Sequence, residues 1–282
     1  MAVAIETDSR EEYLSLQAQV REMFADPLGG WPEPRWPDPL SERLEPLEFI
    51  RRLAQVQLER DEQVRHPFSR KLVLGQLSPV ELKAWVKVNY PHLVQTLRND
   101  AMIVAKAKDV PEMRKQMHVL IEEAGSDLAG GRTTAHPILW IEFGQELGLT
   151  EQEIVQAPLH PFTSVFIDSM ILQGLMRPIG GVPFNLRTGE RAKSVIFPVW
   201  REALAKHYGL SDWALLFFDE HGEADWGHGT IGEEVLLTRC GTLEQQREIW
   251  EAGRRSLARQ YAKFDIWEIA IRWHIETIKS TS

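Results

Sequence analysis

Helical signals recur along this chain from about residue 47 to its end, and no segment alternates apolar and polar residues between hairpin turns. Apolar residues fall at helical intervals over 47–66. Ser78-Pro79-Val80-Glu81 combines a capping serine, a first-turn proline and a glutamate three residues on, which predicts that a helix begins there. Later helices are expected from about residues 111, 136, 150, 161, 190 and 211, and a last one from 242 to about 277. The pattern predicts an all-α fold, one bundle of seven to nine helices.

The first 46 residues differ in character from the rest. Residues 1–26 read as a short amphipathic helix, and residues 27–46 hold six of the sixteen prolines. Proline lacks an amide donor and blocks helix, so we expect an extended connector whose two tryptophans attach it to the domain surface. We therefore predict an N-terminal helix and Pro-rich arm over 1–46 and one helical domain over 47–282. The Pro- and Gly-containing stretch 178–189 is predicted to be a loop.

Composition excludes several classes of protein. Apolar residues make up 43% and charged residues 26%, which is ordinary for a globular chain and excludes a disordered one. The net charge of −9 is spread out with no basic stripe, so nucleic acid is not an expected partner. No apolar run reaches about 18 residues, and the acidic N-terminus lacks the features of a signal peptide. The single cysteine, Cys240, favours a reducing compartment, so we expect a cytoplasmic protein.

The strongest chemical signal is the segment FFDEHGEADWGHG, residues 217–229. His221, Asp225 and His228 are spaced i, i+4 and i+7, so a helix places all three on one face. Two imidazoles and one carboxylate suit a first-row metal, and Fe(II) with open positions for O₂ in particular. The alternative is a polar surface stripe. Four glycines nearby, each costing about 1 kcal/mol in a helix, favour a helix that needs close approach or room for a bound species.

A dinuclear site needs more ligands than this triplet. Three places could supply them: Glu122 or Glu123 before a Gly-rich break, His136 at the start of the next helix, and Glu190 at the start of the helix before the triplet. Each has an alternative interpretation as a helix-terminal or surface residue.

Three patches in order resemble the heme-oxygenase-like diiron oxidases and oxygenases, whose superfamily also holds the pyrroloquinoline-quinone synthase and the TenA thiaminases. The first is LSPVELKAWVKVNYPHL, with Tyr90 and His92. The second is LIEEAG followed by His136-Pro-Ile-Leu-Trp140. The third is Glu190, 31 residues before the His-x3-Asp-x2-His triplet. The resemblance covers about residues 47–280.

The resemblance implies a site of two ferrous ions held by Glu122, His136, Glu190, His221, Asp225 and His228, with O₂ as co-substrate and an external electron donor, because no flavin or nicotinamide fingerprint is present. It also implies that Tyr90 and His92 face a substrate pocket. The loop after Glu122 is longer than in relatives, which leaves Glu122 versus Glu123 open, and the stretch around Glu190 departs from the pattern of close relatives.

The expected activity is O₂-dependent oxidation of a small substrate, most simply N-oxygenation or oxidative cleavage of an amine or amino acid in specialised metabolism. The alternatives are a fatty-acid decarboxylase, a cofactorless oxidase resembling the pyrroloquinoline-quinone synthase, and a non-enzymatic helical binding protein. Thiamine hydrolysis is disfavoured because no cysteine stands in the middle of the bundle. The long apolar face of the final helix could also form a homodimer contact.

Overall fold

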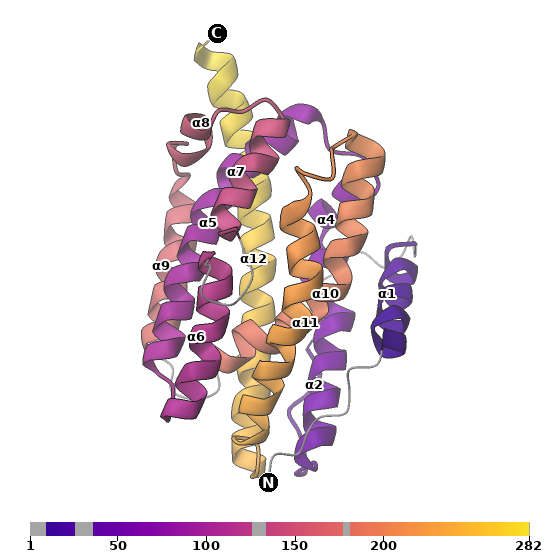
Figure 1. The fold of residues 1–282 in the computed structure, drawn as a ribbon, viewed down its shortest axis with the longest axis vertical. Helices are drawn as coiled ribbons and strands as arrows, with labels where there is room; N and C mark the ends of the chain where they lie inside the picture. Colours follow the sequence, from indigo (N-terminus) through magenta and orange to yellow (C-terminus); the bar gives the residue numbers. More distant parts are fainter. Residues whose placement is uncertain (1–9, 26–35, 126–133, 177–180, 282) are drawn as a thin grey trace. The chain divides into compact units, whose positions relative to one another are not determined.

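The structure is a computed structural model, and it describes residues 10–25, 36–125, 134–176 and 181–281. Within its helices the side chains of 173–176, 181–189, 223–225, 228 and 278–281 also lie outside the described part. The described residues form helices and connecting segments with no strand, which confirms the all-α class (Figure 1). No described helix is both long and apolar enough to cross a membrane. The helices are α1 (Arg10–Ala25), α2 (Pro46–Arg60), α3 (Glu62–Arg65), α4 (Pro67–Val73), α5 (Pro79–Ala105), α6 (Val110–Ala124), α7 (His136–Glu146), α8 (Glu151–Val155), α9 (Pro161–Met176), α10 (Gly181–Tyr208), α11 (Leu216–Leu237) and α12 (Leu243–Thr281).

Twelve helices in the described residues exceed the seven to nine predicted, partly because the segment 47–66 forms two helices, α2 and α3, and α4 follows it directly. The backbone at Asp61 is extended, and its carboxylate caps α3 by accepting the amide of Gln63 at 2.8 Å. The backbone at His66 is extended as well, and its Nδ1 accepts the amide of Phe68 at 3.1 Å, with Pro67 in the first turn of α4. Each cap satisfies amides that a helix start leaves without partners, so the chain can bend twice at little cost.

Other boundaries follow the capping chemistry more closely. Ser78 forms the predicted capping box with Glu81 at the start of α5, and Thr150 forms another with Glu153 at the start of α8. The prediction of a loop over 178–189 is wrong from Gly181 onward, because α10 begins there. Pro183 falls in the first turn of α10, where its missing amide has no helical partner to lose.

Backbone contacts divide the chain into two compact units, each described here by itself. The first comprises Met1–Gly75, Pro178–Tyr208 and Phe218–Tyr261. In it, α10 packs against α1, α2 and α4. Part of its core surrounds Trp250, whose indole donates to the carbonyl of Pro37 at 3.2 Å and meets the ring of Trp36 edge-on. The end of the Pro-rich arm is thus attached through one of its tryptophans, while Trp31 lies outside the described residues.

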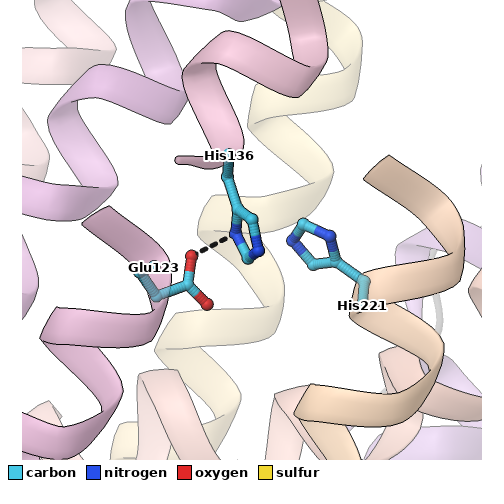
Figure 2. A group of neighbouring side chains, drawn as sticks. All are labelled: Glu123, His136 and His221. Atoms are coloured by element: carbon cyan, nitrogen blue, oxygen red, sulfur yellow. Dashed lines mark ion pairs between the residues drawn. The ribbon is translucent and has the colours of Figure 1, made fainter. Parts of the chain in front are cut away.

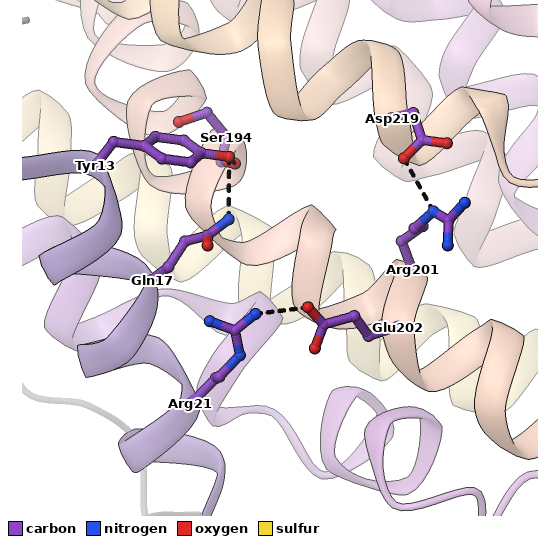
Figure 3. A network of polar contacts seen from close by, with 7 residues as sticks. All are labelled: Tyr13, Gln17, Arg21, Ser194, Arg201, Glu202 and Asp219. Carbon is purple, nitrogen blue, oxygen red and sulfur yellow. Dashed lines mark hydrogen bonds and ion pairs between the residues drawn. The ribbon is translucent and has the colours of Figure 1, made fainter. Parts of the chain in front are cut away.

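Helix α1 is fixed to α10 by a proline-dependent contact. Pro198 interrupts the ladder of α10 because it has no amide to donate to the carbonyl of Ser194, four residues earlier. The hydroxyl of Tyr13 donates to that carbonyl at 3.3 Å, and Gln17 donates to the same hydroxyl at 3.0 Å. Figure 3 shows these contacts beside the ion pair of Arg21 with Glu202.

The second unit comprises Gln76–Arg177, Gly209–Phe217 and Ala262–Ser282, and in it α5 packs against α6, α7, α8 and α9. Its centre is aromatic: the ring of Trp85 meets those of Trp140, Phe143 and Trp267 at centroid distances of 4.9–5.9 Å. The indole of Trp140 donates to the carbonyl of Val86 at 2.9 Å, which fixes α7 against α5. This attachment holds the helix whose first residue is His136.

Candidate metal centre

Glu123 and His136 form a buried ion pair from the end of one helix and the start of the next. Glu123 lies in the last turn of α6, which ends because Gly125 takes φ +74° and donates its amide to the carbonyl of Glu122. His136 is the first residue of α7, followed by Pro137, a residue suited to a first turn. The two side chains are 10% and 6% exposed, and Nδ1 of His136 pairs with Oε2 of Glu123.

Helix electrostatics favour a cation beside Glu123. A nearby cation stabilises a carboxylate at the negative C-terminal end of α6, and burial makes this stabilisation larger. His136, at the start of α7, supplies an imidazole, which ligates metals in its neutral form. The pair therefore combines a carboxylate that needs positive charge with an imidazole donor.

His221 of α11 completes the group. Glu123, His136 and His221 are all buried, and each offers one ligand atom, with these atoms all within 4.8 Å of one another. Figure 2 shows the three side chains and the ion pair between Glu123 and His136. Two imidazoles and a carboxylate match the donor preference of Fe(II), Zn and related first-row ions, so these residues fit a metal.

Aromatic rings flank both histidines. The ring of Phe217 meets that of His136 at 5.8 Å and that of Trp140 at 4.9 Å. The ring of Phe197 meets that of His221 edge-on at 4.9 Å. Rings in these places limit the access of water and fix the imidazole planes, and both effects strengthen the interactions of buried ligands.

The sequence favoured Glu122 as the ligand, but the structure places its neighbour in the group. Oε2 of Glu122 lies 3.3 Å from Nδ1 of His118, one turn earlier on α6, in a contact whose side chains are 27% and 56% exposed. Consecutive helical residues point about 100° apart, so the burial of Glu123 turns Glu122 away. The sequence left this choice open. The structure buries Glu112, Gln116, Val119 and Glu123 at helical spacing on α6, and the use of either glutamate as a metal ligand stays a prediction.

The remaining predicted ligands lie outside the described group. Glu190 is buried in α10 and is not one of its three members. Asp225 and His228 lie on the helical backbone of α11, but their side chains are outside the described residues. The i, i+4, i+7 spacing on one helix is therefore present, and its use as a ligand set stays a prediction.

Tyr90 and His92, the predicted substrate contacts, point in different directions from α5. Partial burial and the carboxylate of Glu151 raise the pKa of the Tyr90 phenol. His92 instead meets the ring of Phe166 on α9 at 5.7 Å. The structure thus associates Tyr90 with α8 and His92 with α9, and neither is among the three clustered residues. Their role toward a substrate remains a prediction.

A model of the family of iron-containing redox enzymes matches residues 83–261. The chain belongs to this family. The matched span contains Glu123, His136 and His221, so the family's iron chemistry and the buried donor group fall in the same part of the chain.

Similar proteins agree with the fold. A 4-aminobenzoate synthase from Chlamydia pneumoniae is 25% identical over 194 residues, which are 67% of this chain and 82% of that protein. A domain with a heme oxygenase-like fold from Shewanella denitrificans aligns with a TM-score of 0.64 at 17% identity, covering 84% of this chain and 96% of its own. A TenA homologue from Pseudomonas syringae pv. tomato aligns with a TM-score of 0.59 at 14% identity, covering 80% and 91%. These structural likenesses confirm the predicted heme-oxygenase-like fold.

Proposed function

We propose that this chain is a non-heme iron oxidoreductase that uses O₂ and an external electron donor to oxidise a small amine or amino acid. The observation that carries the proposal is the buried group of Glu123, His136 and His221 within an iron-containing redox family. We propose two irons, for which Glu190, Asp225 and His228 would supply the further ligands. The single buried cysteine, Cys240, suits a reducing cytoplasm.

The chain's own residues would prepare this site in three ways. Glu123 orients the imidazole of His136 through their pair. The start of α7, a helix held to α5 by the hydrogen bond from Trp140 to Val86, fixes the backbone that carries His136. Phe217 and Trp140 limit water on the side of His136. Bound iron would supply the electrons that reduce O₂. Its carboxylate and imidazole ligands would leave coordination positions open for O₂.

The curated relative supports the choice of substrate class. Its name describes the synthesis of 4-aminobenzoate, a small molecule with an amine and a carboxylate. This favours a small nitrogen-containing substrate over the long acyl chain that a fatty-acid decarboxylase would take.

Anaerobic titration with Fe(II), followed by metal analysis after desalting, tests the proposal. We expect about two irons per chain in the wild-type protein and O₂ consumption when a reductant and a panel of amines and amino acids are added. Glu123→Gln should lower iron affinity at least about tenfold, because a charged ligand becomes a neutral amide. Glu122→Gln, one residue away, is the matched control and should retain iron, since that carboxylate lies beside the exposed His118 and is not a member of the buried group.

The outcomes separate the alternatives. One iron per chain that depends on Glu123 would support a mononuclear centre and contradict the second iron. Equal iron loss in both glutamate variants would show that Glu123 has no special role. No iron in the wild type, with O₂ still consumed, would favour a cofactorless oxidase. No iron and no O₂ consumption would leave a helical binding protein.

A further inference from the structure

A cavity of about 180 Å³ lies within the first unit, lined by residues of α1, α2, α10 and α11. None of its lining residues belongs to the group of Glu123, His136 and His221. Most of its wall is aliphatic, including Leu16 and Ile50. For comparison, an apolar cavity of about 150 Å³ holds a benzene ring. The cavity therefore has room for a molecule with a small aliphatic or aromatic body.

The polar part of the wall contains the buried guanidinium of Arg191, two glutamates, and the side chains of Arg51 and Gln55. The side chain of Arg191 is 7% exposed, and its carbon Cζ lies 4.2 Å from the ring centroid of Trp226. Its Nη1 donates to Oε2 of Glu233 at 3.0 Å, and its Nη2 donates to Oε1 of Glu12 at 3.2 Å. Arg191, Glu233 and Glu12 all line the cavity. A charged group this deep, beside an aliphatic wall, is a typical anchor for a small polar ligand.

The two carboxylates on Arg191 differ in how firmly they are held. The side chain of Glu233 is 6% exposed, so separating it from Arg191 would leave a buried charge without compensation. The side chain of Glu12 is 41% exposed and comes from α1, so water can take over its solvation. Glu12 is therefore the carboxylate that a ligand can displace from Arg191.

We propose that this cavity binds a small zwitterionic amino acid with an aliphatic or aromatic side chain. The ligand carboxylate takes the place of Glu12 on Nη2 of Arg191, and the released Glu12 carboxylate accepts the ligand ammonium. Arg191, Glu12 and both charges of the ligand are then all paired. A simple carboxylic acid would displace Glu12 from Arg191 without supplying an ammonium for it, and a simple amine would draw Glu12 from Arg191 without supplying a carboxylate in its place. The aliphatic wall receives the side chain.

This site goes beyond the proposed oxidation and does not depend on iron, since binding is measured without turnover. The test is isothermal titration of the full chain with L-leucine, with 3-methylbutylamine, which lacks the carboxylate, and with 4-methylpentanoate, which lacks the ammonium. We expect heat from leucine and at least about tenfold weaker binding of each single-charge analogue.

Three variants locate the binding. Ala54→Leu fills the cavity from α2 without changing a charge and should abolish leucine binding. Glu12→Gln should weaken leucine about tenfold and should not weaken 4-methylpentanoate, because that acid has no ammonium for residue 12 to accept. Glu11→Gln, on the exposed neighbouring residue of α1, is the matched control and should bind leucine as the wild type does.

Circular dichroism of each variant checks that it is folded. Leucine binding that Ala54→Leu abolishes and Glu11→Gln preserves supports the site. The proposal is overturned if the folded wild type gives no heat with leucine, or if folded Ala54→Leu binds leucine normally. It is also overturned if the amine or the acid binds as tightly as leucine, since the site would then not recognise both charges of the ligand.

Discussion

Replacing Gly144 by alanine should destabilise the protein although alanine is the better helix former. Gly144 is buried in α7. A Cβ added there would lie 2.5 Å from Cδ1 of Ile154 on α8 and 2.8 Å from Cγ1 of Val86 on α5. Both distances are shorter than a carbon–carbon contact allows, so α7 or its neighbours must shift.

The expected magnitude follows from two opposing effects. Alanine in place of glycine gains about 1 kcal/mol of helix propensity. Overpacking of a buried site costs about 1–3 kcal/mol. The net loss for Gly144→Ala is therefore about 0–2 kcal/mol of unfolding free energy. Gly227 in α11 is the matched control, because an added Cβ meets nothing within 4 Å there and only the gain of about 1 kcal/mol applies.

Urea denaturation followed by circular dichroism measures both variants. A second substitution, Ile154→Val, removes the atom with the shortest contact and should recover about 1 kcal/mol in the Gly144→Ala background, although alone it costs about 0.5–1.5 kcal/mol. Equal stabilisation by Gly144→Ala and Gly227→Ala would refute the close approach of α7 to α5 and α8.

Three further predictions follow from single contacts. Burial, and then the charges of Lys87 and His160, lower the pKa of His274 from 6.5 to about 4. The unfolded chain therefore binds a proton more readily, so the free energy of unfolding should fall by about 3 kcal/mol as the pH drops from about 6.5 to 4. His274→Gln should reduce this pH dependence in denaturation experiments across that range. Trp140→Phe removes a buried hydrogen bond and ring area, and should lower the free energy of unfolding by about 2–3 kcal/mol in chemical denaturation. Trp213→Phe, at a half-exposed position, should stay within about 0.5 kcal/mol of wild type, and similar losses from both variants would contradict the packing of α7. Tyr13→Phe takes away the donor to the Ser194 carbonyl and should cost about 1 kcal/mol, seen as a lower urea midpoint, and an unchanged midpoint would mean that water replaces it fully.

Local signals made the helix starts predictable, since a cap such as Ser78 with Glu81 involves residues three apart. The orientation of α6 was not predictable in the same way. Its apolar residues Met113 and Met117 are exposed, while Glu112, Gln116 and Glu123 are buried. Hydrophobic periodicity assumes that apolar residues face inward.

A helix that buries polar residues instead needs partners from elsewhere in the chain. For Glu123 that partner is His136, which comes after the intervening loop. The sequence could therefore bring a glutamate of this helix and His136 to one site by resemblance, but not choose between Glu122 and Glu123. The break at Asp61 was not predicted for a related reason, because an aspartate is compatible with the middle of a helix as well as with a cap.

Pro198 interrupts α10 and frees the carbonyl to which Tyr13 donates. The contribution of each residue to stability therefore depends on the other, although more than half of the chain separates them. Without the phenol, the proline leaves a backbone oxygen for water to satisfy; without the proline, the phenol loses its acceptor to the helix itself. In related sequences the two residues should therefore be gained and lost together. A shortened protein that starts after α1 should recover part of its lost stability when Pro198 is replaced by alanine.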